Sequence, residues 1–325
     1  MSYLIGTDEA GFGPNLGPLT VSATVWELPP GVSGDELYEV LGGVIVRTPA
    51  EVAKSDRPCV AMSDSKDLYK PKAKAGLKHL ERGLLAAAAV LDLNPAGWRD
   101  IWEALAPDSA QARQAIPWYA DYEMPIPIDA GPTEIQPLAD ALAAGLADAG
   151  VRLLAVRSRA VFPQEFNRLV AEHQSKGAAL SHITLALAAQ SMGRLDPGTV
   201  SVVCDKHGGR DRYADLLADH FPDRFIEIHG EDRRRSVYRF GPTDGRVEFR
   251  FQTKAERYLP VALASMASKY LRELAMRAFN EFWLARLDGL KPTAGYPQDA
   301  KRFRQDIADV QAALGIEDGV LWRTK

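Results

Sequence analysis

Apolar and polar positions alternate along the chain in a way that predicts strands and helices in turn. Short apolar runs near 3–7 and 18–26 predict two strands that pair with each other. The alanine-rich stretch at about 71–91 predicts a helix. Later strands are expected near 151–156, 200–204, 225–229 and 246–252, and later helices near 163–174, 177–193, 255–286 and 298–314. Such mixing of strands and helices is typical of an α/β fold.

Two adjacent carboxylates, Asp8 and Glu9, lie where the first strand meets a glycine-rich loop that runs to Pro18. Successive side chains of a regular strand point to opposite faces, so these two acids could share an ion only if the pleat ends there. Glycine accepts positive φ and proline cannot continue the strand pairing, so both favour such an ending. The residues concerned are Gly11, Gly13 and Pro14.

Three interpretations of this loop compete. Asp8 and Glu9 could be loop acids in water, or the glycines could form a dinucleotide-binding loop, or the acids could bind a metal ion. A dinucleotide loop is disfavoured because its glycines open a helix, whereas here they precede Pro18 and a strand-like run. A metal site needs further carboxylates, since magnesium requires several oxygen ligands.

Further acids stand in suggestive positions. Asp205 follows the short buried-type strand that ends at Cys204, and α/β proteins place their chemistry at the ends of such strands. An aspartate there could equally cap a helix or close a turn. Glu273 lies in the long helical stretch near the C-terminus, where a lone glutamate is usually a solvated surface residue.

The region 93–150 reads as a partly helical insertion rich in aromatic and proline residues. Its aromatic side chains could stack on nucleic-acid bases, but an ordered insertion must bury something, so core packing is the favoured interpretation. The aromatic residues are Trp98, Trp102, Trp118, Tyr119 and Tyr122.

Composition narrows the picture only slightly. The chain has 325 residues, 46% of them hydrophobic, and a net charge of −4, which argues against a surface that is basic throughout. Cys59 and Cys204 form neither a zinc pattern nor a disulfide framework, and the longest apolar stretch is too short for a membrane span, so a cytoplasmic protein is expected. Local basic residues could still contact phosphates; they are Arg233, Arg234, Arg235, Arg239, Arg246, Arg250, Lys254 and Arg257.

Several motifs, taken in order, resemble those of type 2 ribonucleases H, the HII and HIII classes. The run Gly6–Pro18 is similar to the opening G-x-D-E-A-G-x-G-P motif of that family. The other matching segments are Ser63–Leu68, Val161–Asn167, the strand before Asp205, Thr253–Glu256, Ala264–Glu273 and Gly295-Tyr296. The resemblance spans residues 4 to about 305, with one gap at the insertion.

The resemblance is to a divergent member. The HII pattern has arginine where this chain has Phe12, and it usually ends its acidic quartet with aspartate, where Glu273 is expected here. A glutamate at position 273 and the Thr-Lys-Ala-Glu sequence at 253–256 are closer to the HIII class. The first strand is nevertheless expected to begin at Tyr3, which leaves no room for the N-terminal domain of that class.

The resemblance implies a ribonuclease H-like fold, with a mixed central sheet flanked by helices, in one domain over residues 1–325. Residues 93–150 would be the family-atypical insertion and 255–325 a C-terminal helical segment. It implies that Asp8, Glu9, Asp205 and Glu273 are catalytic and bind two Mg²⁺ or Mn²⁺ ions about 4 Å apart. It further implies substrate contacts from Gly11, Phe12, Gly13, Lys66 and Tyr296.

The implied activity is metal-dependent hydrolysis of the RNA strand of RNA/DNA hybrids, leaving 3′-hydroxyl and 5′-phosphate ends. Two alternatives stay open: a nuclease for another structured nucleic acid, because Phe12 alters the loop that would read the ribose, and a non-catalytic nucleic-acid-binding protein that kept the fold. The expected partner is a nucleic acid; neither a membrane nor an obligate protein partner is indicated.

Overall fold

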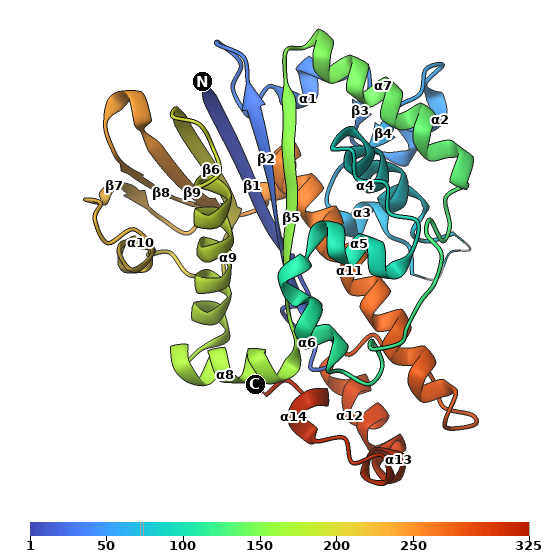
Figure 1. Cartoon of the computed structure of the whole chain (residues 1–325). Coiled ribbons are helices and arrows are strands. Elements are labelled where there is room, and N and C mark those ends of the chain that lie inside the picture. The colour runs from blue at the N-terminus through green and yellow to red at the C-terminus, as the bar shows by residue number, and fades with distance from the viewer. Residues whose placement is uncertain (72, 74, 325) are drawn as a thin grey trace.

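A seven-stranded mixed sheet forms the centre of the computed structural model, which describes residues 1–71, 73 and 75–324 (Figure 1). The strands lie in the order β5-β2-β1-β6-β9-β8-β7. Their bounds are β1 Ser2–Ala10, β2 Leu19–Leu28, β5 Arg152–Val161, β6 Thr199–Asp205, β7 Glu227–Glu231, β8 Arg235–Phe240 and β9 Val247–Gln252. The prediction of an α/β fold with a mixed, helix-flanked sheet is therefore confirmed.

Strand β1 lies inside this sheet, between β2 and β6. It pairs antiparallel with β2, with Asp8 opposite Ser22, and parallel with β6, with Thr7 opposite Cys204. The pleat continues through Ala10, two residues past Asp8, so the expectation that it ends at the two carboxylates is wrong in that detail. What ends there is the neighbouring strand β6, whose last residue is Asp205.

Helices cover both faces of the sheet. On one face lie α11 (Leu259–Leu284) and α4 (Lys78–Val90), and their apolar side chains share a core with residues from Leu4 to Leu321. The other face carries α8 (Pro163–His173), α9 (Lys176–Met192) and α10 (Ala214–His220) around a second core (Figure 1). The helix α11 runs beside β1, and Gly6 allows the closest approach, because a Cβ there would lie 2.3 Å from the Val261 nitrogen.

The insertion packs into the first core through α5 (Trp98–Leu105) and α7 (Ile135–Asp148), and Arg113 of α6 (Ala110–Gln114) lies over the Trp98 ring. Trp98 and Trp102 are 1% exposed, and Trp118 contacts Phe279 of α11 edge to face with ring centroids 5.2 Å apart. Core packing, the favoured interpretation of these aromatic residues, is confirmed, and stacking on nucleic-acid bases is excluded for the buried rings.

Other elements depart modestly from the prediction. The helix expected at 71–91 begins only at Lys78, after a short α3 (Ser65–Leu68); two positions of the expected helix, 72 and 74, lie outside the described residues. Strand β8 and helix α10 were not predicted. The remaining elements are α1 Leu37–Val40, β3 Ile45–Val46, α2 Pro49–Lys54, β4 Val60–Ala61, α12 Pro297–Asp306, α13 Ala308–Ala313 and α14 Asp318–Leu321, besides four 3₁₀ turns, η1 Pro107–Ser109, η2 Pro132–Glu134, η3 Thr243–Gly245 and η4 Ala255–Arg257.

Among the helices of the described part of the chain, none has the length and apolar character needed to cross a membrane.

Candidate metal and nucleic-acid site

The parallel pairing of β1 and β6 brings two of the predicted acids to one edge of the sheet. Because Thr7 lies opposite Cys204, the next residues along the two strands, Asp8 and Asp205, are neighbours. Asp8 is 8% exposed, and its backbone carbonyl accepts a hydrogen bond from the Ser268 hydroxyl of α11 at 3.0 Å. Asp205 Oδ1 accepts from the Ala255 backbone N–H at 3.4 Å. Helix α11 and the turn before it thus fix both acids.

A fourth carboxylate enters from that same turn, and it belongs to Glu256. Glu256 follows Ala255 directly, and its side chain lies 3.9 Å from the Lys66 ammonium group. Lys66 is also 3.7 Å from Asp64, the residue that caps α3. Four acids and one lysine therefore face this edge of the sheet: Asp8, Glu9, Asp205, Glu256 and Lys66. We refer to the four acids as the carboxylate cluster.

Mutual repulsion within the carboxylate cluster is evident from the pKa of its members. Burial, then the charge of Glu9, raises the pKa of Asp8 well above its ordinary value, although a hydrogen bond from Ser265 opposes the change. Burial and the charge of Asp205 raise the pKa of Glu9 to about 7, with Lys66 acting in the opposite sense.

The other two acids respond in the same direction. Burial raises the pKa of Asp205 against the lowering effect of nearby backbone N–H groups. Burial, followed by the charges of Asp205 and Asp64, raises the pKa of Glu256. Partial burial disfavours the charged form of Lys66, but the surrounding carboxylates together raise its pKa. The acids outnumber the cation, so a positively charged ligand would relieve the repulsion.

Glu273, the predicted fourth acid, is placed elsewhere. Its two carboxylate oxygens accept from Lys269 at 2.5 Å and from the Tyr69 hydroxyl at 2.7 Å, and it lines a separate cavity that also contains Asp129 and Arg277. Along α11 it comes eight residues after Ser265, which corresponds to about 12 Å of helix. The structure therefore does not bring Glu273 to Asp8, and Glu256 stands in that place.

The segment that contains Glu256 resembles the family pattern, but no role was predicted for Glu256 itself. The available signal was the Thr253-Lys254-Ala255-Glu256 run, which starts directly after β9, the strand parallel to β6. A carboxylate at the end of the strand next to β6 must lie close to Asp205. The helix position of Glu273 carries no such constraint.

Two buried arginines hold the glycine-rich loop at the end of β1. Arg272 of α11 donates to the carbonyl oxygen of Pro18 at 2.8 Å and to that of Leu16 at 3.3 Å. Arg323, near the C-terminus and 0% exposed, donates to the carbonyl oxygens of Gly11, at 2.6 Å, and Pro14. Neither arginine was predicted from the sequence, because both act on backbone carbonyl groups and leave no motif.

These contacts turn loop carbonyls inward. Gly11 has φ +92°, and a Cβ on it would lie 2.6 Å from the Pro18 carbonyl oxygen, so glycine is required. Among the described residues, none accepts a hydrogen bond from the backbone N–H of Phe12 or Gly13. Those two donors are therefore available to a ligand.

The remaining predicted substrate residues surround the loop. The Phe12 ring reaches the loop after β6, where a Cβ on Gly208 would lie 3.7 Å from it. Tyr296 is 58% exposed and lies over Gly13. The carbonyl oxygen of the preceding residue, Gly295, accepts a hydrogen bond from the Asn15 N–H at 2.7 Å. Lys66 belongs to the same side as the carboxylate cluster. The structure thus gathers Gly11, Phe12, Gly13 and Tyr296 next to each other.

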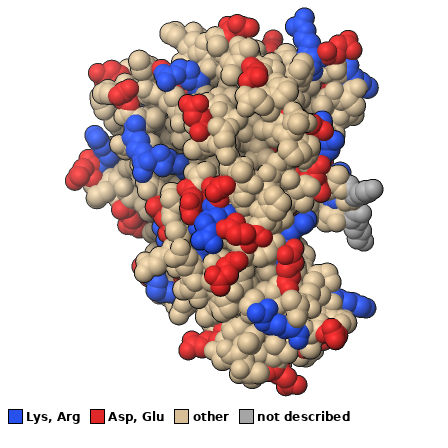
Figure 2. Space-filling view, turned by 45° about the vertical axis from the view of Figure 1, so that its right-hand side comes forward, with Lys and Arg blue, Asp and Glu red and all other residues tan. Residues whose placement is uncertain are grey.

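The predicted basic stretch does not form one continuous surface. Arg239 and Arg250 both pair with Glu248, at 2.8 and 3.0 Å, and Arg246 pairs with Glu227 at 3.0 Å. On the face shown in Figure 2, basic and acidic groups are interspersed. Three arginines, Arg233, Arg234 and Arg235, are exposed at the turn between β7 and β8.

The donor set suits hard divalent cations. Carboxylate oxygens are the ligands that Mg²⁺ and Mn²⁺ prefer, and burial together with the neighbouring carboxylates raises the pKa of Asp8 and Glu9, so their charged forms are disfavoured unless a cation binds. Within the described residues, no three acidic, histidine or cysteine side chains already stand at metal-binding spacing. The residues present fit such a cation by the chemistry of their donor atoms.

Among known proteins, solved structures resemble this chain at low sequence identity. No protein-family model matches the chain, and no curated protein matches it. Among solved structures, the chain is similar to ribonuclease HII of Archaeoglobus fulgidus, solved with PCNA, at 13% identity over 99% of this chain and 94% of that one (TM-score 0.43). It is also similar to ribonuclease H2 of Pyrococcus horikoshii OT3, at 15% identity over 98% and 92% (TM-score 0.40).

A third similar structure is Bst ribonuclease HIII with Mn²⁺, at 15% identity over 99% of this chain and 66% of that one (TM-score 0.43). At 13–15% identity and TM-scores of 0.40–0.43, these are similarities alone, and the function is argued from the side chains of this chain.

Proposed function

We propose that the protein is a metal-dependent endonuclease that hydrolyses the RNA strand of RNA/DNA hybrids and leaves 3′-hydroxyl and 5′-phosphate ends. The observation that carries the proposal is the carboxylate cluster, in which Asp8, Glu9, Asp205 and Glu256 meet beside a loop with free backbone donors. A buried group of acids without matching cations is costly unless a cation binds there.

The four acids would hold two Mg²⁺ or Mn²⁺ ions. When bound, such ions supply Lewis acidity that activates water and stabilises the leaving oxygen of a phosphodiester. The chain's own contribution is to orient the acids. Ser268 and the Ala255 N–H hold the Asp8 backbone and the Asp205 carboxylate in place.

Recognition of the substrate would come from the loop and its neighbours. The N–H groups of Phe12 and Gly13 can donate to a phosphate or to the 2′-hydroxyl that distinguishes RNA from DNA. Lys66, whose side chain is 79% exposed, can reach a phosphate that has entered the site. Tyr296 is exposed over Gly13 and can pack against a sugar.

Phe12 bears most directly on the substrate class. The Phe12 ring contacts the loop after β6 and adds no charge to the ribose-reading loop. A nuclease acting on another structured nucleic acid would have the same carboxylate cluster, so the experiment must compare substrates.

The test is cleavage of labelled RNA/DNA hybrid by the wild type and by Asp8→Asn, in Mg²⁺, in Mn²⁺ and in chelator. Duplex RNA, duplex DNA and a DNA duplex with one ribonucleotide are tested in parallel. We expect metal-dependent cutting of the hybrid that Asp8→Asn abolishes. Cutting of duplex RNA or DNA alone would change the substrate class, and no cutting by folded, metal-loaded protein, with retained binding of the hybrid, would establish a non-catalytic role.

A further inference from the structure

A pocket of about 300 Å³ lies along the outer edge of β5, on the opposite side of β2 from β1. Helix α9, the end of α5, the 3₁₀ turn η1 and the segment that follows α4 complete its walls. Five leucines give it an apolar lining: Leu91, Leu93, Leu105, Leu154 and Leu187. Neither the carboxylate cluster nor the glycine-rich loop contributes to it.

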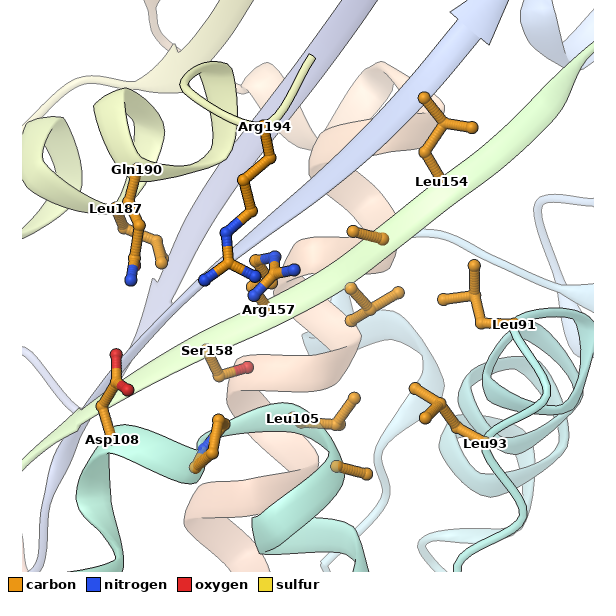
Figure 3. A pocket seen from close by; sticks show the side chains of 14 residues that line it. Leu91, Leu93, Leu105, Asp108, Leu154, Arg157, Ser158, Leu187, Gln190 and Arg194 are labelled. Atoms are coloured by element: carbon orange, nitrogen blue, oxygen red, sulfur yellow. The ribbon is translucent and has the colours of Figure 1, made fainter.

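Two arginines reach into this pocket from different elements. Arg157 comes from β5, Arg194 follows the end of α9, and Figure 3 shows their guanidinium groups close to each other. Among the described residues, neither side chain has a hydrogen-bond or ion-pair partner. Burial, and then the charge of Arg194, lowers the pKa of Arg157. Two like charges thus face one space, and the charge of Asp108, which lines the same pocket, only partly opposes the fall in the pKa of Arg157.

Polar groups of the opposite kind stand across the pocket. Asp108, Ser158 and Gln190 line the same space, and the charge of Asp108 acts on Arg157 (Figure 3). The pocket therefore offers a cationic end, an apolar floor and an acceptor. This combination matches a ligand with a phosphate at one end, a flat or apolar body and a hydrogen-bond donor.

We propose that this pocket binds a phosphate-bearing ligand of nucleotide size, with its phosphate between Arg157 and Arg194 and its body against the leucines. Guanidinium groups bind phosphate oxygens in paired hydrogen bonds, and two of them match the charge of a phosphate group. The phosphate could belong to a free mononucleotide or to a nucleotide within a strand.

The proposed ligand binding does not depend on the proposed cleavage activity. The pocket is nevertheless close to the carboxylate cluster, because Ser158 of β5 pairs with Ser22 of β2 and Ser22 pairs with Asp8 of β1. The Ser158 and Ser22 hydroxyls are 2.7 Å apart, and the Ser268 hydroxyl is within 2.8 Å of Ser22 and 3.0 Å of the Asp8 carbonyl oxygen. Binding must therefore be measured separately from cleavage.

The experiment is titration calorimetry of the full chain in chelator, which prevents metal-assisted phosphate binding at the carboxylate cluster. The probes are AMP, adenosine, and a tetranucleotide of single-stranded DNA with and without a 5′-phosphate. The variants are Arg194→Ala and Arg157→Ala, each checked for wild-type unfolding by urea. Arg152→Ala is the matched control, because Arg152 is on the same strand but pairs with Glu27 outside the pocket.

We expect AMP or the phosphorylated tetranucleotide to bind saturably, and each pocket variant to weaken that binding roughly tenfold or more, with Arg152→Ala within about twofold of the wild type. Binding of AMP identifies a free nucleotide as the ligand, and binding of the tetranucleotide alone identifies a strand. Equal binding of AMP and adenosine, unchanged affinity in Arg194→Ala, or no saturable binding of any probe would overturn the proposal. If Arg157→Ala is unstable, Arg194→Glu, at an exposed position, decides the matter.

Discussion

Two buried acids in this molecule have opposite surroundings. Asp8, in the carboxylate cluster, faces Glu9, Asp205 and Glu256, and its pKa is raised. Glu81, on α4 and 0% exposed, accepts from the N–H groups of Ile128, Asp129 and Ala130 at 2.5, 2.7 and 2.7 Å, and from the Tyr270 hydroxyl at 2.9 Å.

The difference lies in what compensates the buried charge. Glu81 is satisfied by fixed donors that belong to the insertion and to α11, so its role is to attach the insertion to the fold. Asp8 faces other acids, and only something from outside the chain can neutralise them. Burial of an acid is therefore not a sign of function; burial beside other acids is.

The largest effect is expected from the fourth acid of the cluster. Glu256→Gln removes a charged oxygen ligand and should reduce cleavage of the hybrid roughly 1,000-fold, about 4 kcal/mol of transition-state stabilisation. Glu273→Gln, which alters an acid outside the cluster, should stay within about threefold of the wild type. The cleavage rates of the two variants are compared at saturating Mg²⁺. Equal losses of activity in both would show that Glu273 also belongs to the site.

The contrasting acid should affect folding instead. Glu81→Ala leaves one buried and two partly buried N–H groups without an acceptor and should lower the free energy of unfolding by about 4 kcal/mol. Urea unfolding measures this loss. The exposed Glu103→Ala, on α5, serves as the control and should change stability by less than about 0.5 kcal/mol. A wild-type unfolding curve for Glu81→Ala would contradict the structural role.

The repulsion among the clustered acids predicts a pH dependence. The folded-state pKa of Glu9, about 7, is above its ordinary value of 4.5, so the folded protein retains a proton that the unfolded chain loses between these values. Stability of the metal-free protein should therefore fall as pH rises from 4.5 to 7, by roughly 1–3 kcal/mol more than in Glu9→Gln. Added Mg²⁺ should recover the loss. Parallel pH profiles of the wild type and Glu9→Gln would refute this.

The smallest effect is expected from Lys66, an exposed cation at the rim of the cluster. Lys66→Ala should raise the KM for the hybrid roughly fivefold, about 1 kcal/mol, and leave kcat nearly unchanged. Lys54→Ala, at the end of α2, is the matched surface control. A loss confined to kcat would show that Lys66 acts in the chemical step rather than in binding.

The fold was largely accessible from the sequence because its strongest elements are long and periodic. The central strands and the helices α8, α9 and α11 were predicted close to their observed bounds, and the buried tryptophans were correctly expected in the core. Strand β8 was missed because its alternating pattern, Arg235–Phe240, lies within a stretch dominated by arginines.

The candidate site was accessible only in part. Asp8, Glu9 and Asp205 could be predicted because each lies at or near a strand end. Glu256 could have been chosen from its position shortly after β9, whereas the position of Glu273 relative to β1 depends on how α11 packs, which the sequence does not show. Arg323 could not be predicted at all, since it acts on Gly11 from 312 residues away.

That last contact has a consequence for how the protein folds. The carbonyl groups of the glycine-rich loop receive Arg323 across about 310 residues of chain, so they are oriented only when distant segments have come together. Contacts of such large sequence separation form slowly, because the chain between them must first lose conformational freedom. The loop therefore reaches its final arrangement together with the rest of the fold rather than as a local unit.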